Sequence, residues 1–358
     1  MITLVSFVFV IGVLVAIHEA GHFLAARSVG VHVEKFYIGF NLFGYGWKKE
    51  INGTEYGLGW LPLGGYVKVS GMIDESLDNE ISMVPKKYQF KYKPLWAKIW
   101  ILSGGVIMNF VLATCIFSFQ FYSNGTYDID KSTTIGGVME NSPAYNLGIK
   151  VDDEIISINN SNVSSWESMT ELIHANPNKK LLLSWKSGTN MFSDSILTIS
   201  NNRIIDRNIS EVGIIGISPV LLNREINLRE SIYLGVSRVF NLIDMMMITI
   251  KLLFLGSISI NEMAGPIMIA KVAGETATQG LFALFSLMAF LSVNLGLINI
   301  LPVPGLDGGH IAIILVEALY RKELPIKIKM GIQQVGMLFL FMLFITIMVN
   351  DILRIFNF

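Results

Sequence analysis

LVSFVFVIGVLVAIHEAGHFLAA, residues 4–26, combines a long apolar run with the pattern His18-Glu19-Ala20-Gly21-His22. The run is as long as the ~20 apolar residues that a membrane-spanning helix requires, so we expect it to cross a bilayer. Residues four apart share one face of a helix, so both imidazoles can bind the same zinc ion. The glutamate beside the first histidine can act as general base on water. Because ionisable groups are costly in hydrocarbon, this trio predicts a functional site.

The composition is that of a membrane protein. Apolar residues make up 52% of the 358 and charged residues only 15%, whereas soluble domains carry about 25% charged residues. The mean hydropathy is +0.54. A formal net charge of −1 gives no indication of a nucleic-acid partner. Cys115 is the only cysteine, so neither an intramolecular disulfide nor a thiolate metal cluster is expected.

Further apolar runs approach the length of a membrane span. Three of them lie at about residues 99–121, 281–301 and 331–349. A weaker run, residues 236–258, contains Asp244 and Lys251. The first run of the chain lacks the basic flank and small-residue cleavage site of a signal peptide, so we interpret it as a retained helix.

The stretch NLGLINILPVPGLDGGH, residues 294–310, can complete the zinc site. A catalytic zinc ion has three protein ligands and an open position, and two histidines are not enough. Pro302 and Pro304 interrupt the helix, and irregular backbone at membrane depth is tolerated where it lines a cavity. Asp307 is therefore the candidate third ligand. Two alternatives remain: His310 could be the ligand, and Asp307 could simply cap the next helix.

Two modules of different character separate the spans. In residues 56–70, YGLGWLPLGGYVKVS, the alternation at 65–70 suits a strand, and the glycines and the single proline suit a hairpin turn, which together predict a β-hairpin. Residues 123–218 are more polar and contain turn signals, a predicted helix at 166–176 and a predicted strand at 180–185. The order of these elements resembles a single PDZ domain of the kind found in bacterial proteases. A generic small β-rich domain is the alternative.

Together, the HExxH pattern, the NxxPxPxLDG pattern and the module between them resemble the site-2 protease family of intramembrane metalloproteases. Three further segments share the resemblance: Gly64-Gly-Tyr-Val-Lys68, Gly105-Val-Ile-Met-Asn109 and Gly265-Pro-Ile-Met-Ile-Ala270. The resemblance implies that His18, His22 and Asp307 bind one zinc ion and that Glu19 is the catalytic base. His310 then becomes a supporting residue rather than a ligand.

The same resemblance implies residues that contact substrate. Asn299 and Asn294 would hold the substrate backbone. Apart from the resemblance, the developing oxyanion has three candidate partners: the zinc ion itself, Asn299 and Asn109. The strand at residues 64–70 would pair with the extended substrate. Within this strand, Gly65, Tyr66 and Val67 are the residues expected to contact the substrate.

The resemblance also implies an architecture: a polytopic α-helical membrane protein with four transmembrane helices, a membrane-associated β-hairpin and one extramembrane α+β PDZ domain. Well-known members of the family carry two tandem PDZ domains, whereas this chain has room for one, which leaves open how substrate access is controlled. The expected parts are two transmembrane helices with the hairpin (1–122), the PDZ domain (123–220), a membrane-surface helical segment (221–280) and two further transmembrane helices (281–358).

The zinc site restricts the topology. His18 and His22 lie toward the end of the first span, and Asp307 follows the span at 281–301. These two spans must therefore run in the same direction. One crossing between them, the span at 99–121, gives that result. A further crossing at residues 236–258 would separate the ligands, so we expect this segment to lie along the membrane surface.

A lysine cluster before the second span sets the expected orientation: Lys86, Lys87, Lys91, Lys93 and Lys98. Such clusters mark the cytoplasmic face. We therefore expect the zinc site near the cytoplasmic face of the bacterial inner membrane, with both termini and the PDZ domain on the periplasmic side.

The predicted activity is zinc-dependent hydrolysis of peptide bonds within or near the membrane-spanning segment of single-span membrane proteins, such as anti-sigma factors or signal-peptide remnants. Partners would be these substrates and the lipid bilayer. The PDZ domain would either bind a ligand or exclude bulky substrates. Two other classes compete with this prediction. A non-catalytic PDZ adaptor would not need Glu19, and a metal transporter would spread its ligands over several spans.

Overall fold

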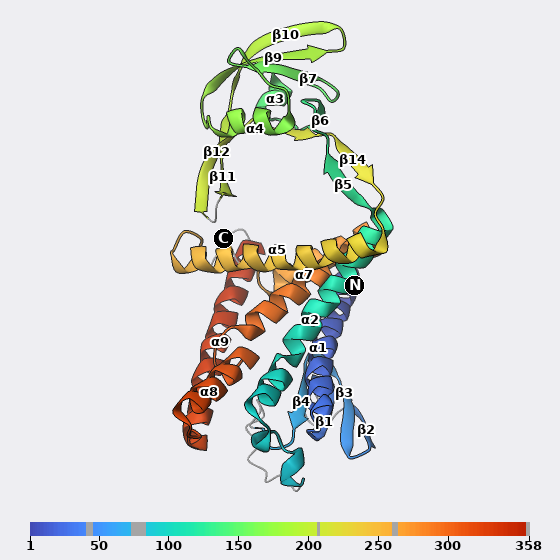
Figure 1. Cartoon of the computed structure of the whole chain (residues 1–358), viewed down its shortest axis with the longest axis vertical. Helices are drawn as coiled ribbons and strands as arrows, with labels where there is room; N and C mark the ends of the chain where they lie inside the picture. The colour runs from blue at the N-terminus through green and yellow to red at the C-terminus, as the bar shows by residue number, and fades with distance from the viewer. Residues whose placement is uncertain (41–45, 73–83, 206–207, 260–263, 356–358) are drawn as a thin grey trace. The chain divides into compact units, whose positions relative to one another are not determined.

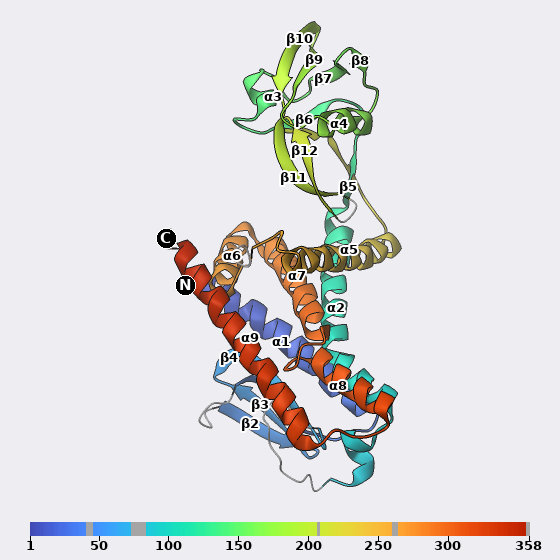
Figure 2. The ribbon, with the colours of Figure 1, turned by 90° about the vertical axis from the view of Figure 1, so that its left-hand side faces the viewer.

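The computed structural model describes residues 1–40, 46–72, 84–205, 208–259 and 264–355. The chain forms two compact units: Met1–Phe121 together with Leu228–Phe358, and Tyr122–Asn227. We call them the helical unit and the β-rich unit. Figure 1 and Figure 2 show how the elements of each unit are arranged.

Four helices in the described residues are long and apolar enough to cross a membrane, which matches the predicted number. They are α1 (Ile2–Ser28), α2 (Leu95–Asn124), α7 (Leu281–Ile300) and α9 (Ile326–Ile355). Helices α1 and α7 run in the same direction and α2 runs back (Figures 1 and 2), as closure of the predicted zinc site requires.

The described part of the helical unit contains three more α-helices: α5 (Leu228–Phe254), α6 (Pro266–Gln279) and α8 (Asp307–Tyr320). Helix α5 covers the weak apolar run and does not qualify as a membrane span. It lies crosswise to α1, α2 and α7 (Figures 1 and 2). Its expected position along the membrane surface stays a prediction. Two short 3₁₀ helices, η2 (Lys86–Tyr88) and η3 (Phe90–Tyr92), precede α2.

Helices α1 and α2 approach each other closely because each carries a glycine at the crossing. A Cβ atom on Gly21 would lie 2.2 Å from the carbonyl oxygen of Gly104, and one on Gly104 would lie 2.5 Å from that of Gly21. Small residues are typical of such contacts in membrane proteins, since they let backbones meet. Ala25 and Ala26 are buried in the next turn of α1. This contact brings the histidine-bearing face of α1 against α2.

A four-stranded sheet follows α1, with strand order β2-β3-β1-β4. The strands are β1 (Val33–Phe40), β2 (Gly46–Ile51), β3 (Thr54–Gly59) and β4 (Leu61–Val69). One face packs on α1 through the ring contacts of Phe23 with Phe36 and Tyr56. Strand β4 pairs with β1 and forms one edge of this sheet.

The predicted hairpin at residues 56–70 is wrong. Strands β3 and β4 are consecutive in sequence, yet they pair with opposite sides of β1, β3 in parallel and β4 antiparallel. The hairpin instead joins β2 to β3, with a turn at Asn52 (φ 50°) and Gly53 (φ 76°). Two residues with positive φ define the type I′ turn that suits a two-residue hairpin, and Asn-Gly is its preferred sequence.

The described residues of the β-rich unit form a hydrophobic core that includes Ile135, Ile155, Met169 and Leu183. The predicted helix and strand are confirmed as α4 and β9. Its strands are β5 (Thr126–Ile129), β6 (Ile135–Val138), β7 (Glu154–Ile158), β8 (Ser161–Asn162), β9 (Lys180–Ser187), β10 (Asn190–Leu197), β11 (Ile199–Ile205), β12 (Asn208–Ile214), β13 (Ile217–Pro219) and β14 (Leu221–Arg224); its helices are α3 (Pro143–Asn146) and α4 (Trp166–His174).

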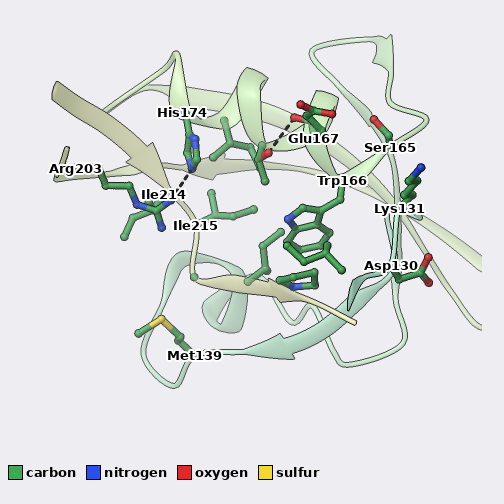
Figure 3. A pocket seen from close by; sticks show the side chains of 16 residues that line it. Asp130, Lys131, Met139, Ser165, Trp166, Glu167, His174, Arg203, Ile214 and Ile215 are labelled. Carbon is green, nitrogen blue, oxygen red and sulfur yellow. Dashed lines mark hydrogen bonds between the residues drawn. The ribbon is translucent and has the colours of Figure 1, made fainter. Parts of the chain in front are cut away.

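A groove of about 790 Å³ lies in the β-rich unit between α4 and β13 (Figure 3). Helix α4 begins at a capping box formed by Ser165 and Ser168, which fixes the position of its first turn. Strand β13 pairs with β6 on one side. The groove therefore has a helix as one wall and a short strand as the other.

Candidate active site

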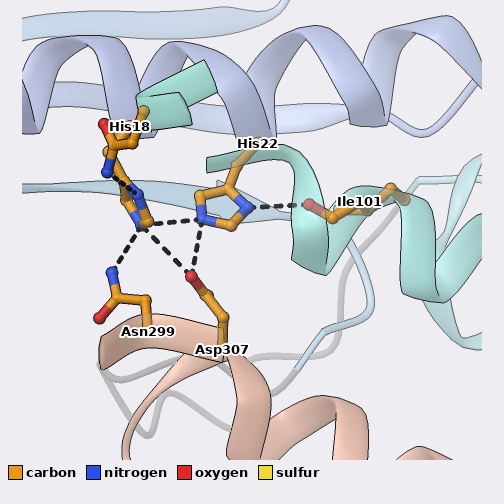
Figure 4. Close-up of polar contacts among 6 residues, drawn as sticks. His18, His22, Ile101, Asn299 and Asp307 are labelled. Carbon is orange, nitrogen blue, oxygen red and sulfur yellow. Dashed lines mark hydrogen bonds and ion pairs between the residues drawn. The ribbon is translucent and has the colours of Figure 1, made fainter. Parts of the chain in front are cut away.

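The helical unit brings His18 and His22 of α1 next to Asp307, the first residue of α8 (Figure 4). Asp307 Oδ2 lies 3.3 Å from Nε2 of His18 and 3.3 Å from Nε2 of His22. The two Nε2 atoms are 3.2 Å apart. The three residues predicted to hold a metal are thus adjacent, although 285 positions separate His22 from Asp307 in the sequence.

A tight turn after α7 places Asp307. Gly305 has φ +93°, in the region that favours glycine. A Cβ atom on Gly308 would lie 2.2 Å from the Leu301 carbonyl oxygen, and one on Gly309 would lie 2.3 Å from that of Val303. Only glycines at these positions let the first turn of α8 fold back onto the preceding loop. The LDGG sequence therefore serves the geometry of the turn as well as its chemistry.

Helix α9 supports the same turn. The backbone N–H of Gly305 donates a 2.5 Å hydrogen bond to Oε1 of the buried Gln333. Nε2 of Gln333 lies 3.4 Å from Nδ1 of His310. A Cβ atom on Gly336 would lie 2.1 Å from the Pro304 carbonyl oxygen, so α9 and the turn are in backbone contact. The sequence patterns did not identify Gln333, because no local pattern links it to the turn.

The three donor atoms fit a zinc ion. Ligand atoms about 2.0–2.1 Å from a tetrahedral zinc ion lie about 3.3–3.4 Å apart, close to the observed spacing. Asp307 Oδ2 is buried and makes no hydrogen bond of normal geometry among the described residues; its close neighbours are the two imidazole nitrogens. A buried carboxylate oxygen without a donor is costly, and a cation removes that cost. Two nitrogens and one carboxylate also form a ligand set that zinc uses in catalytic sites.

Glu19 lines the same cavity, which has a volume of about 440 Å³. Strand β4 runs directly over this glutamate: a Cβ atom on Gly65 would lie 3.0 Å from Glu19 Cγ and 2.7 Å from the Tyr37 carbonyl oxygen. Tyr66 and Val67 line the cavity as well. The strand edge, the glutamate and the three donor atoms therefore share one cavity.

The predicted asparagines are in three different positions. Asn299 lines the cavity, with Nδ2 3.2 Å from His18 Nε2. Asn294 does not line it, and its amide donates a 3.2 Å hydrogen bond to the Phe290 carbonyl oxygen of its own helix. Asn109 is fully buried, with Nδ2 3.1 Å from His18 Nδ1, on the side of the ring away from Asp307. In this structure Asn294 and Asn109 do not face the cavity, and the proposed contacts of both residues with substrate stay predictions. An asparagine in a membrane helix indicates a polar site. The sequence of the helix does not tell whether its amide lies on the cavity side or on the far side of a metal-binding histidine.

Two lysines that the sequence patterns did not single out also line the cavity. Lys35 of β1 and Lys68 of β4 are paired across the strands, and residues opposite each other share a face of the sheet. Nζ of Lys68 lies 4.0 Å from Glu34 Oε2. The alternation of β1 is the signal that could have placed them.

The groove of the β-rich unit has basic residues at one end. Arg203 Nη1 lies 3.5 Å from His174 Nε2 (Figure 3). Partial burial and, secondly, the charge of Arg203 hold the pKa of His174 below its ordinary value. His174 is therefore neutral near pH 7, and Arg203 carries the positive charge at this end.

Residues 6–343 match the model of peptidase family M50. A protein of Rickettsia conorii named "Putative zinc metalloprotease" is 33% identical, with 100% of each chain covered. A protein of the same name from Clostridium acetobutylicum is 31% identical over 97% of this chain and 96% of its own length. The "Probable protease eep" of Enterococcus faecalis is 26% identical over 99% of both chains.

The chain therefore belongs to peptidase family M50, the site-2 proteases, and is a membrane-bound zinc metalloprotease. Among solved structures, the PDZ domain of the SdrC-like protein from Listeria monocytogenes covers 26% of this chain and 94% of that domain, with a TM-score of 0.22 and 18% identity. A likeness at that level establishes nothing about the β-rich unit.

Proposed function

We propose that this metalloprotease cleaves single-span membrane proteins within or next to their membrane-spanning segment, with His18, His22 and Asp307 as ligands of one zinc ion and Glu19 as general base. The observation that carries the proposal is the convergence of three donor atoms, each 3.2–3.3 Å from the next, in a cavity that also contains a carboxylate and a strand edge. The cavity lies among helices long and apolar enough to span a membrane.

The residues divide the chemistry between them. When bound, zinc supplies a Lewis acid that polarises the scissile carbonyl and brings the pKa of a water molecule toward ~7. Glu19 accepts the proton as water attacks and donates it to the leaving amine. Asn299 faces the same cavity and can donate its amide hydrogens to the substrate carbonyl.

Strand β4 supplies the binding surface for an unwound substrate. A helical substrate hides its carbonyl groups in internal hydrogen bonds, so the cleaved segment must become extended. An edge strand offers replacement backbone hydrogen bonds by β-augmentation. Strand β4 is an edge of its sheet, and residues 65–69 line the cavity beside Glu19. Gly65, Tyr66 and Val67 therefore hold the substrate backbone against the catalytic groups.

The β-rich unit acts as a PDZ domain. A groove between a helix and a strand edge is the geometry in which PDZ domains bind an extended peptide. The groove between α4 and β13 has this form and is mostly apolar, with Arg203 near one end. Either it binds a substrate terminus, or the unit excludes substrates with large extramembrane domains.

The protein lies in the bacterial inner membrane with its zinc site near the cytoplasmic face. Lysines are enriched on cytoplasmic segments, and five lie at or just before the start of α2: Lys86 and Lys87 in η2, Lys91 in η3, Lys93 at the end of η3, and Lys98 in the first turn of α2. Trp96 and Trp100, in the first two turns of α2, are exposed, as is typical of residues at a membrane–water interface. Both termini and the β-rich unit are then on the periplasmic side.

The test is cleavage of a reconstituted single-span protein by the full chain and by Glu19→Gln, with zinc content measured in both. We expect cleavage by the wild type only, at a bond within or next to the apolar segment, and about one zinc ion in each protein. Glu275→Gln, an exposed carboxylate on α6, is the matched control and should cleave normally. Cleavage by Glu19→Gln at the wild-type rate would exclude Glu19 as the base. Zinc in both with cleavage by neither would favour the non-catalytic adaptor.

A further inference from the structure

One stripe of α2 forms the wall behind both histidines. Ile101, Gly105 and Asn109 are spaced by four residues, so they lie on one face of this helix. His18 and His22 have the same spacing on α1. A Cβ atom on Gly105 would lie 2.5 Å from His18 Cε1 and 2.5 Å from His22 Nε2, so both rings pack against bare backbone. One turn before Gly105, Ile101 contacts the ring of His22, and one turn after it, Asn109 contacts the ring of His18.

The ring of His22 is oriented by a backbone group. Its Nδ1 lies 2.8 Å from the carbonyl oxygen of Ile101 (Figure 4). A carbonyl oxygen can only accept, so Nδ1 carries the proton and donates it. Nε2 then has its lone pair free and directed at Asp307 Oδ2. Such a hydrogen bond on the far nitrogen is how metal-binding histidines are held in the ligating tautomer.

The ring of His18 meets a side chain in the equivalent position. Asn109 is fully buried, its Nδ2 lies 3.1 Å from His18 Nδ1, and its Oδ1 is buried with no hydrogen-bond partner among the described residues. The backbone carbonyl of Asn109 accepts a 2.8 Å hydrogen bond from Ser292 Oγ, which ties this turn of α2 to α7. The backbone of this turn is therefore held in place, and the buried side-chain amide can face the ring in two orientations, related by a flip of its oxygen and nitrogen.

These two orientations have opposite consequences for His18. With Nδ2 toward the ring, Nδ1 must accept, so the proton is on Nε2 and that nitrogen cannot bind a metal. With Oδ1 toward the ring, Nδ1 must donate, and Nε2 has a free lone pair like that of His22. The second orientation gives the buried oxygen a donor and moves the amide nitrogen to the position that the oxygen occupied, so hydrogen-bond satisfaction alone does not decide between the two. A zinc ligand needs a free lone pair on Nε2, and only the orientation with Oδ1 toward the ring provides it.

We propose that Asn109 is a positioning residue: its Oδ1 accepts the Nδ1 hydrogen of His18 and so holds Nε2 as a zinc ligand, as the Ile101 carbonyl does for His22. Asn109 acts through His18 and does not touch the substrate. The inference rests on the proposed zinc role of His18.

The test measures zinc affinity by competition with a chelator on the purified full chain. Loss of the partner of a metal-binding histidine typically weakens metal affinity 10–100-fold, so we expect this loss for Asn109→Leu, and for Asn109→Ala should the leucine variant fail to fold. Asn109→Asp keeps an acceptor at Oδ1 and should bind zinc within a few-fold of wild type. Gln120→Leu is the matched control: it removes an amide of α2 that bonds to α7 away from the site.

Three results would overturn the inference. If Asn109→Asp loses as much affinity as Asn109→Leu, the acceptor is not what matters. If Asn109→Leu binds zinc like the wild type but has a raised KM, the residue contacts substrate. If Gln120→Leu weakens zinc binding equally, the effect is general loss of helix packing. A wild-type protein without zinc would instead contradict the proposed function itself.

Discussion

Asp351, near the end of α9, accepts a hydrogen bond from the backbone N–H of Gly265 at 2.9 Å. Its other oxygen accepts from the N–H groups of Ile267 and Met268, both at 3.0 Å. These are N–H groups at the start of α6, which have no partner within that helix. A carboxylate there also interacts favourably with the positive end of the helix dipole. Asp351 is fully buried, so α9 and α6 are joined by an anionic cap from a distant helix.

Replacing Asp351 by alanine should destabilise the helical unit by about 2–4 kcal/mol, since buried donors lose a charged acceptor. We expect a lower unfolding temperature in detergent and faster proteolysis near Gly265. Glu275→Ala removes an exposed carboxylate of α6, paired with Lys271 only at 4.0 Å, and should change stability by less than about 1 kcal/mol. Equal effects of the two variants would show that the buried cap contributes nothing special.

Gly105→Ala should abolish zinc binding while leaving the protein folded. The added Cβ would lie 2.5 Å from both imidazole rings, so at least one ring must move out of its ligating position. Metal analysis of the purified variant checks this. Gly12→Ala on α1 is the control, because a Cβ there meets nothing within 4 Å. Normal zinc content in Gly105→Ala would mean that the rings can shift together without losing the ion.

Gly65→Ala should reduce cleavage of a membrane-spanning substrate at least tenfold with zinc content unchanged. A Cβ at this position would press on the Tyr37 carbonyl and on Glu19, which moves β4 away from the general base. Displacements near 1 Å at a catalytic group can cost about 100-fold in rate. Gly331→Ala on α9 meets nothing within 4 Å and should cleave normally. A fully active Gly65→Ala would show that the position of β4 over Glu19 is not critical.

Removing the charge of Arg203 should raise the pKa of His174. Burial is the larger cause of the lowered pKa of His174, and the charge of the Arg203 guanidinium is the smaller one. Arg203→Met should therefore shift this pKa back toward 6.5. Because the unfolded chain binds this proton more tightly, the contribution of His174 to stability is complete above pH 6.5 and is lost as the pH falls below it. Histidine NMR of the full chain, assigned with His174→Ala, measures the shift. An unchanged pKa in Arg203→Met would exclude this coupling.

Several parts of the fold follow from short sequence patterns. Apolar length indicated four strong spans and one weaker run, and closure of the zinc site excluded the weaker run as a crossing. The HExxH and LDGG patterns were enough to join His18, His22 and Asp307 in one hypothesis. That success has a physical basis, because ionisable groups and broken helices are tolerated at membrane depth only for a reason. The hairpin was misplaced because strand pairing is not local. The stronger signal, Asn52-Gly53, was present in the sequence but was not used.

The supporting contacts of the site could not be predicted. Gln333 reaches Gly305, and Asn109 reaches His18, across long sequence separations and through the packing of separate helices. An amide in an apolar helix has no period or neighbour that specifies its partner. The same limit applies to Asp351, whose role depends on where α6 begins. Such residues are found only when helix packing is known.

Zinc should stabilise the helical unit through Asp307, and this can be measured without substrate. A metal that binds the folded protein and not the unfolded chain raises stability by RT ln(1 + [L]/Kd), or about 2.7 kcal/mol when the metal is at 100 times its Kd. A strong chelator should therefore lower the unfolding temperature of the wild type. Asp307→Asn lacks the anionic ligand, so chelator should change its unfolding temperature little. Asp244→Asn on α5, outside the three-residue donor group, should respond like the wild type. A chelator-sensitive Asp307→Asn variant would require another third ligand, and His310, which also lines the cavity, is the candidate.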